Sequence, residues 1–351
     1  MATVRNERYD VAILESVEAI PEREWNEVVE RSALSCLFHR HEWLRAIEHG
    51  TDHVPRHLVA HKDTNLVGLF PNFVTGIDGT PFRRLASLTL GCGGPLVTTD
   101  EDEIIRTFLE VIPTIEGRTT VSHVISAADQ GYVRYGNTLQ KAGYTPSVET
   151  CRVLVDLTRD WDDVLAGMDR GRRRGIRKGH ERDVTVSHEP VTRDRLDSFY
   201  DEYRAVIDRL GATPLPRTFV TALAELDDRI LLLSLDIDGT DAGSYLYLID
   251  AERSALHHYL SGVRQSHFEY NASELLHEHA MKWGVENAIE CYDLGAVRSD
   301  FQHGLFGFKE SFGGDTVPLL SWERGLSRPE WWLFDAARRV HQRFGIGGGG
   351  R

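Results

Sequence analysis

Runs of apolar and polar residues predict the same order of elements twice along the chain. In the first half, helical spacing of apolar residues predicts two helices, which precede a pair of strand-like runs joined by the polar turn Lys62-Asp63-Thr64-Asn65. The predicted elements of this half are helices 21–31 and 41–49, a hairpin of strands 56–61 and 66–74, a helix ending near 112, strand 120–126, helix 132–142 and strand 151–157.

The second half gives stronger signals in the same order. Helices are predicted over 196–210 and 218–226, and the Asp238-Gly239 pair marks a tight turn between two strands. The elements that follow the helices are strands 229–235, 242–249 and 255–260, helix 271–286 and strand 288–294. The repeated order resembles a divergent internal duplication. We therefore predict an N-terminal domain over 1–160, a C-terminal domain over 161–344, and a disordered glycine-rich tail over 345–351.

Composition supports a globular protein with two cores. The 351 residues are 41% hydrophobic and 27% charged, and no apolar run reaches the length of a membrane span. The first residues do not resemble a secretory signal, so a cytoplasmic protein without membrane insertion is expected. The net charge is −14, and only five of the 40 basic residues are lysines. This balance suits a halophilic cytoplasm and argues against a general DNA binder; a mesophilic protein with an unusually acidic surface is the alternative.

The residues usually needed for metal or nucleophilic chemistry lack the required spacing. The four cysteines are widely scattered, and His41-Glu42-Trp43-Leu44-Arg45 does not give the His-Glu-x-x-His pattern. No serine has the context of a nucleophile elbow. We expect neither a metal site nor a covalent serine mechanism.

Several segments resemble the FemAB-like branch of the GNAT acyltransferase superfamily, which includes peptidoglycan-bridge aminoacyltransferases and the BioF2-like domain. Three antiparallel strands followed by a helix and a strand is the core order of the GNAT fold. The segments that carry the resemblance are Leu37–Trp43, Gly93-Gly94-Pro95-Leu96, Gly171–Gly179, Tyr270–Leu276, Glu290–Gly295 and Gly304–Gly314.

The resemblance implies an α+β fold of two tandem GNAT-like domains, each a mostly antiparallel twisted sheet flanked by helices. It implies transfer of an acyl or aminoacyl group from an activated donor, such as acyl-CoA or acetyl-CoA, to an acceptor amine such as an amino sugar or a peptide. An aminoacyl-tRNA is an alternative donor, because the peptidoglycan branch uses one. A degenerate GNAT pair that only binds or scaffolds is a further alternative, since the usual glycine-rich loop of acetyl-CoA users is absent.

Three residues are predicted to carry catalysis. Lys309, in Phe-Lys-x-x-Phe-Gly, is a cation between apolar residues that can serve as an oxyanion or carboxylate partner; a snorkelling surface lysine is the alternative. Asp293 is a candidate base or orienting group, or else a strand-end cap. His258 and Tyr259 lie on the strand that lines the acyl site in GNAT enzymes. Adjacent strand residues face opposite sides, so we predict that one of them, Tyr259, points inward; a packed core tyrosine is the alternative.

Donor or substrate binding is predicted at two places. The only dense basic run can contact a phosphate of coenzyme A, a tRNA acceptor end or a phosphorylated substrate, unless it is a solvated helix face paired with nearby aspartates. Its candidate residues are Arg172, Arg173, Arg177 and Lys178. The loop before helix 271–286 corresponds to the pyrophosphate-binding loop of the family, unless it is a plain loop that caps the helix with Asn271. Its candidates are Arg264, Gln265, Tyr270 and Asn271.

Overall fold

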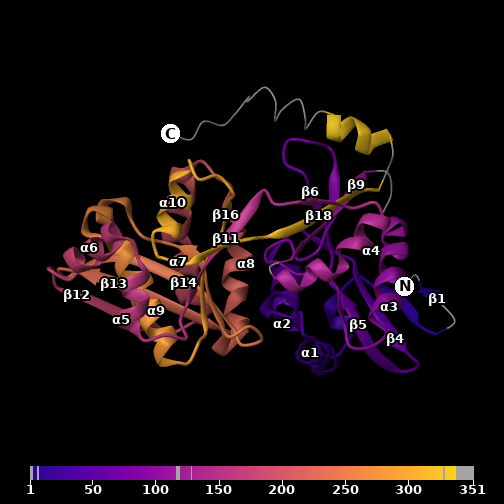
Figure 1. Cartoon of the computed structure of the whole chain (residues 1–351), viewed down its shortest axis with the longest axis horizontal. Coiled ribbons are helices and arrows are strands. Elements are labelled where there is room, and N and C mark those ends of the chain that lie inside the picture. The colour runs from indigo at the N-terminus through magenta and orange to yellow at the C-terminus, as the bar shows by residue number, and fades with distance from the viewer. Residues whose placement is uncertain (1–2, 6–7, 116–118, 128, 327–328, 337–351) are drawn as a thin grey trace. The chain divides into compact units, whose positions relative to one another are not determined.

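The computed structural model describes residues 3–5, 8–115, 119–127, 129–326 and 329–336. The chain forms two compact units, whose helices and strands are shown in Figure 1. The first unit combines residues 1–148 with 319–351, and the second consists of residues 149–318. Within the described residues, no helix is long and apolar enough to cross a membrane.

The described part of the first unit combines two sheets with several α-helices. Its helices are α1 (Glu22–Arg31), α2 (His41–Gly50), α3 (Glu101–Val111) and α4 (Gly136–Lys141). Its strands are β1 (Thr3–Arg5), β2 (Asp10–Leu14), β3 (Val54–Pro55), β4 (His57–Lys62), β5 (Asn65–Phe70), β6 (Phe73–Gly76), β7 (Arg83–Ala86), β8 (Leu96–Val97), β9 (Thr120–Ala127), β10 (Thr145–Ser147) and β18 (Leu320–Gly325). The strand orders are β1-β2-β4-β5-β8 and β10-β18-β9-β7-β6-β3.

The second unit is built on one seven-stranded sheet. Its helices are α5 (Trp161–Gly167), α6 (Arg170–Gly179), α7 (Arg193–Leu210), α8 (Arg217–Ala222), α9 (Ala272–Glu286) and α10 (Gly304–Glu310). Its strands are β11 (Thr150–Asp156), β12 (Val184–Glu189), β13 (Ile230–Ile237), β14 (Thr240–Asp250), β15 (Ala255–Ser261), β16 (Cys291–Arg298) and β17 (Asp315–Pro318). They lie in the order β12-β13-β14-β15-β16-β11-β17.

Leucines and tyrosines at alternating strand positions form the core of the second unit. Leu231, Leu233 and Leu235 of β13 share a buried cluster with Leu275 and Leu276 of α9. Long helix α7 begins where the side chain of Thr192 accepts a hydrogen bond from the Arg195 amide, and it ends at Gly211 with φ of 65°. Burial on this scale fixes α9 against the sheet, and α9 carries several residues of the site described below.

Each unit repeats one parallel connection within an otherwise antiparallel sheet. Strands β7 and β9 are parallel and joined through α3, and strands β15 and β16 are parallel and joined through α9. The predicted α+β class with mostly antiparallel sheets flanked by helices is confirmed. The repeated strand–helix–strand connection agrees with the predicted internal duplication.

The division of the chain differs from the predicted boundary at 160/161. Strand β11 precedes that boundary but pairs with β16 and β17 of the second unit. Strand β18 lies in the predicted second domain but pairs with β9 and β10 of the first unit. Local patterns identify strands but not their distant partners, so this exchange was not predicted. The tail over 345–351 lies outside the described residues.

The hairpin predicted in the first half is present, but its second strand is shorter than predicted. β4 and β5 pair antiparallel, whereas residues 73–76 form β6 in the other sheet. The break falls at Pro71 and Asn72, where proline lacks an amide hydrogen for the ladder. The Asn72 amide instead donates to Nδ1 of His57 at 3.1 Å. One apolar run therefore supplies strands to two sheets.

Candidate active site

Strands β15 and β16 separate soon after they meet. They pair only where Ala255–His257 faces Cys291–Asp293. Beyond this point Lys309 of α10 donates hydrogen bonds from Nζ to the carbonyl oxygens of Gly295 at 2.9 Å and Ala296 at 3.0 Å. Lys309 therefore binds the main chain of β16 at the point where β15 no longer pairs with β16.

A cavity of about 440 Å³ lies beside β15 at this point and includes Lys309 in its wall. Its walls come from α7, β14, β15, α9 and α10 and from the segment before α9. The lining residues are Val206, Arg209, Leu210, Tyr245, His258, Ser261, Val263, Phe268, Ser273, Glu274, His277, Leu305, Phe308 and Lys309. The wall is largely apolar, and its charged residues are Arg209, Glu274 and Lys309, beside a few neutral polar groups. Such a wall suits the apolar part of a small-molecule ligand.

Lys309 is the predicted catalytic residue that lines this cavity. It is 8% exposed, and burial lowers its pKa to about 8, although the Asp293 carboxylate acts in the opposite direction. Because this pKa is above neutrality, the ammonium form predominates at pH 7. A cation held by two carbonyls at the cavity wall can stabilise negative charge that develops on a bound substrate.

His258 and Ser261 of β15 form a hydrogen-bonded pair in the same wall. Ser261 Oγ and His258 Nε2 lie 3.0 Å apart, and the ring of His258 packs on Tyr245 at 4.5 Å between centroids. Burial and the nearby Lys309 lower the pKa of His258 to about 3, so its imidazole is neutral at pH 7. The pair therefore offers neutral polar groups to a ligand.

His277 of α9 is a second neutral histidine in the wall. Its Nδ1 lies 2.5 Å from the hydroxyl of Tyr292, and its ring packs edge-on against Phe312. Burial holds its pKa well below the ordinary range. His277 could not be predicted as a site residue, because a buried histidine on a helix has no distinguishing local pattern.

Tyr259 does not line the cavity, contrary to the prediction that it rather than His258 points inward. The register between β14 and β15 shifts here: Leu246 faces Leu260, while Tyr247 faces His258. Tyr259 is the extra residue of a β-bulge, which the simple alternation rule does not anticipate.

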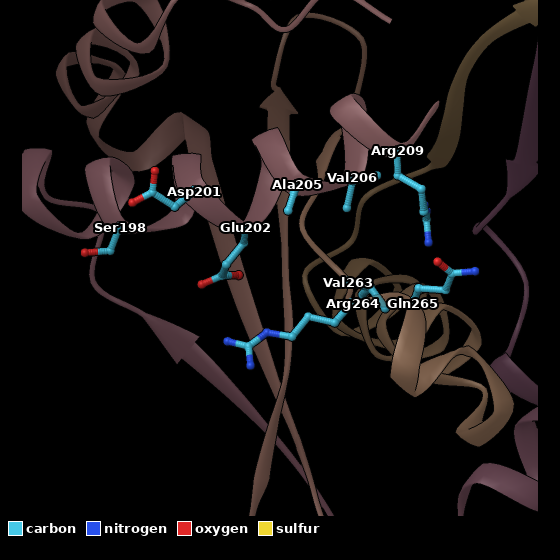
Figure 2. A pocket seen from close by; sticks show the side chains of 9 residues that line it. All are labelled: Ser198, Asp201, Glu202, Ala205, Val206, Arg209, Val263, Arg264 and Gln265. Carbon is cyan, nitrogen blue, oxygen red and sulfur yellow. The ribbon is translucent and has the colours of Figure 1, made fainter. Parts of the chain in front are cut away.

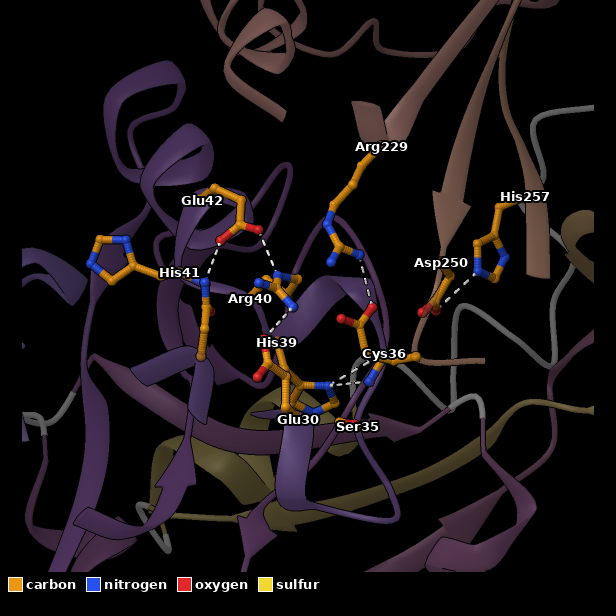
Figure 3. Close-up of polar contacts among 12 residues, drawn as sticks. Glu30, Ser35, Cys36, His39, Arg40, His41, Glu42, Arg229, Asp250 and His257 are labelled. Atoms are coloured by element: carbon orange, nitrogen blue, oxygen red, sulfur yellow. Dashed lines mark hydrogen bonds and ion pairs between the residues drawn. The ribbon is translucent and has the colours of Figure 1, made fainter. Parts of the chain in front are cut away.

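Asp293 is buried in a charged network and is not among the residues that line the cavity. Its Oδ2 lies 2.7 Å from Arg152 Nη1 and 2.8 Å from His257 Nδ1, and its Oδ1 accepts from the Gly295 amide at 2.8 Å. His257 also contacts Asp250 through Nε2, as Figure 3 shows. These partners outweigh burial and hold the pKa of Asp293 well below its usual range. Of its two predicted roles, the contacts favour orienting the Gly295 turn over accepting a proton.

The side chain of Arg172 is bound by other residues inside the protein. It forms an ion pair with Glu274, donates to Ser311 Oγ at 2.8 and 3.0 Å, and stacks on Phe308 and Phe312. Its partners Glu274 and Phe308 line the cavity. Arg172 therefore joins α6 to the cavity wall, which leaves it poorly placed to receive an external phosphate.

The rest of the basic run lies on the outer side of α6. Gly171, Gly175 and Gly179 recur every four residues, and added Cβ atoms at the last two would come within 3.0 Å of Asn271 and 2.9 Å of Leu275. This close packing leaves the other side of the helix exposed. Arg173 donates to the Ala166 carbonyl at 2.6 Å. Arg170, Arg174, Arg177 and Lys178 are exposed, and among the described residues the last three have no ion-pair partner.

The four candidates in the loop before α9 are dispersed. Arg264 pairs with Asp241 at 2.8 Å, and Tyr270 lies under the guanidinium of Arg182. Asn271 has φ of 61° and makes no side-chain cap hydrogen bond, so the capping alternative is not observed. Arg264 and Gln265 line a separate cavity of about 620 Å³, shown in Figure 2.

Comparisons with known proteins agree with this geometry. Residues 167–309 match the family model of the acetyltransferase (GNAT) domain. No curated protein matches the sequence. The crystal structure of FemX is similar over 90% of this chain and 98% of its own, with a TM-score of 0.69 and 13% identity.

Two further solved structures share the architecture. L-PGS from Bacillus licheniformis is similar over 87% of this chain and 92% of its own, with a TM-score of 0.56 and 13% identity. The tandem GNAT protein from the clavulanic acid biosynthesis pathway is similar over 91% and 98%, with a TM-score of 0.53 and 13% identity. Residues 167–309 therefore form a GNAT acetyltransferase domain, which supports a transferase, and the chain as a whole shares its fold with FemX and the tandem GNAT protein.

Proposed function

We propose that the protein is an N-acyltransferase that moves an acyl group from acyl-CoA or acetyl-CoA to the amine of a small acceptor, an amino sugar or a peptide. The observation that carries the proposal is the place of Lys309 in the wall of the 440 Å³ cavity, at the parting of β15 and β16. The apolar residues around it suit the acyl chain and its linker.

Lys309 would stabilise the negative charge that develops on the substrate during the reaction. When the amine attacks the acyl carbon, the carbonyl oxygen becomes an oxyanion, and a nearby ammonium group lowers the energy of that state. Neutral His258 and Ser261 can hydrogen-bond the substrate without adding charge.

A second candidate is transfer from an aminoacyl-tRNA. The exposed cations of α6 favour a donor rich in phosphates, which both coenzyme A and tRNA are. FemX and L-PGS support the fold of this alternative but not its donor, since their identity to the chain is 13%.

The test is acyl transfer to a mixture of amino sugars and short peptides, with labelled acetyl-CoA and charged tRNA as separate donors. Labelled product with either donor supports the proposal and identifies the donor. Absence of product with both would favour a binding or scaffold role for the GNAT pair.

Lys309→Met removes the charge at nearly constant volume. We expect kcat to fall about 100-fold or more, which is the usual effect of losing one oxyanion donor. Lys282→Met is the matched control, since that lysine pairs with Glu278 outside both cavities. Activity of the wild type should also fall as pH rises past about 8, where Lys309 loses its proton. Full activity of Lys309→Met would show that this lysine is structural.

A further inference from the structure

A second cavity, of about 620 Å³, adjoins the one that contains Lys309. The two share Val206 and Arg209 of α7 and Val263 after β15. An acyltransferase brings together two substrates, and two adjoining cavities with common walls provide two compartments. If the donor takes the compartment of Lys309, the second is available for the acceptor.

Glu202 is the acidic side chain that extends from α7 toward the loop after β15 in this cavity, as Figure 2 shows. Its side chain is 15% exposed. Its Oε1 lies 3.5 Å from Nη1 of Arg195, but its buried Oε2 has no hydrogen-bond partner among the described residues. A buried carboxylate oxygen without a partner is costly, and a ligand can supply the missing donor.

The main chain makes room for this carboxylate at Gly262. A Cβ atom on Gly262 would lie 2.9 Å from the Cβ of Glu202 and 3.1 Å from its Oε2. Gly262 is held in turn by its amide, which donates to the Ser244 carbonyl at 2.7 Å. Only glycine therefore lets Glu202 approach the end of β15 so closely.

The other charged groups in this cavity are engaged elsewhere. Asp201 is ion-paired with Arg217, Arg264 with Asp241, and Arg209 stacks over Phe268. Among these groups, Glu202 has a buried oxygen without a hydrogen-bond partner in the described residues. A protonated amine supplies both the donors and the complementary charge.

We propose that the 620 Å³ cavity is the acceptor compartment and that Glu202 binds the acceptor's ammonium group and takes its proton. This inference rests on the proposed N-acyl transfer.

Two protons leave the acceptor nitrogen during this transfer. The bound ammonium gives one proton to Glu202, and the freed lone pair forms the C–N bond to the acyl carbon. The bond from that carbon to the donor's sulfur or oxygen breaks, and the leaving group takes the electron pair and the second proton of the nitrogen. Glu202 then returns the first proton to solvent. Burial and the charge of Asp241 raise the pKa of Glu202. A hydrogen bond with Ser244 and the charges of Arg195 and Arg264 act in the opposite direction but do not cancel the rise. The raised pKa makes the carboxylate a better base.

The test measures binding of amines and transfer separately. D-Glucosamine and glycylglycine are titrated into the full-length protein by calorimetry, with glucose and N-acetylglycylglycine as controls that lack the amine. We expect at least one amine to bind more tightly than its control. In Glu202→Gln its affinity should fall about 10- to 100-fold, the usual effect of losing a charged hydrogen bond. Asp208→Asn removes one charge from the same helix outside both cavities and should leave affinity unchanged.

Transfer with acetyl-CoA and with charged tRNA is then measured on the same variants. Binding that depends on Glu202, without turnover by the wild type, would support the compartment and refute the proposed function. Turnover and affinity that are both unchanged in Glu202→Gln would refute the compartment and leave the function standing. If neither amine binds the wild type better than its control, the inference is wrong whatever the turnover.

Discussion

Replacing His257 with glutamine tests whether the network beneath the site holds a charged imidazole. His257 is buried between two carboxylates, with Nδ1 2.8 Å from Asp293 and Nε2 3.3 Å from Asp250. Burial alone would lower its pKa, but hydrogen bonds and charge from the two aspartates raise it to about 9. The substitution removes a charge that both carboxylates need, and breaking a buried pair in this way costs about 3–5 kcal/mol.

The raised pKa also predicts how stability depends on pH. The folded protein binds the His257 proton more tightly than the unfolded chain, in which the pKa is about 6.5. The stability that this proton contributes is therefore complete below pH 6.5 and is lost as the pH rises toward 9. Each pH unit in that window removes about 1.4 kcal/mol, so a rise from pH 6.5 to 8 removes roughly 2 kcal/mol from the free energy of unfolding.

The pH range of this test ends at pH 8, because above it the contribution of Lys309 to stability changes with pH in the opposite direction. Its pKa is lowered to about 8, so above that pH the unfolded chain binds its proton more tightly than the folded protein. The resulting gain in stability offsets the continuing loss from His257. The lowered pKa values of His258 and His277 act below pH 6.5 and so lie outside the window.

The assay is denaturant unfolding at pH 6.5, 7.0, 7.5 and 8.0, followed by circular dichroism. The difference in unfolding free energy between wild type and His257→Gln should narrow by roughly 2 kcal/mol across this range. His303→Gln, a substitution at an exposed histidine of the same unit, should show a constant difference. Parallel curves for wild type and His257→Gln would refute a charged imidazole in the network.

Two further predictions concern α6. Gly179→Ala should destabilise the second unit by about 1–3 kcal/mol, because its new Cβ would lie 2.9 Å from Leu275. Gly171→Ala places its Cβ where no atom lies within 4 Å, so it should stabilise the helix by about 0.5–1 kcal/mol. Thermal unfolding of both variants checks this pair. Replacing Arg174 and Arg177 with serine should weaken binding of coenzyme A or tRNA at low salt, with a smaller effect at high salt. Arg204→Ser on α7 is the control and should leave the affinity unchanged. Equal affinity of the wild type and the double variant at low salt would show that these α6 arginines are only solvated surface residues.

The sequence predicted most elements of the second unit because each has its own local period. Strands 229–235, 242–249 and 255–260 and helix 271–286 correspond closely to β13, β14, β15 and α9. Lys309 could also be selected, because a lysine between phenylalanines is unusual in a chain with only five lysines. These signals depend on residues within a few positions of each other.

Features that depend on register or distant partners were not predicted. The bulge at Tyr259 places His258, and not Tyr259, in the cavity wall, because one extra residue breaks the alternation of side chains along the strand. Glu202 looked like one more charged residue on an amphipathic helix, and only the nearby Gly262 gives it an enclosed position. Arg172 looked available to a phosphate until its contacts with Glu274 and Ser311 became visible.

The exchange of β11 and β18 makes the second unit an insertion into the first. The chain leaves the first unit after β10 and returns in β18, and these strands pair where Ser147 faces Ser321. The inserted unit begins and ends in strands that also pair, with Cys151 opposite Pro318. Both ends of residues 149–318 are therefore neighbours, and a short turn could join Ser147 to Ser321 if that segment were removed.

This arrangement changes how the protein can be cut. A single proteolytic nick at 148/149 leaves the units covalently connected through 318/319, so separation requires two cuts. A fragment that starts at 161 lacks β11 and with it Arg152, the partner of Asp293. A fragment over 149–318 keeps all seven strands of its sheet, so it, and not a simple C-terminal half, is the piece to express alone.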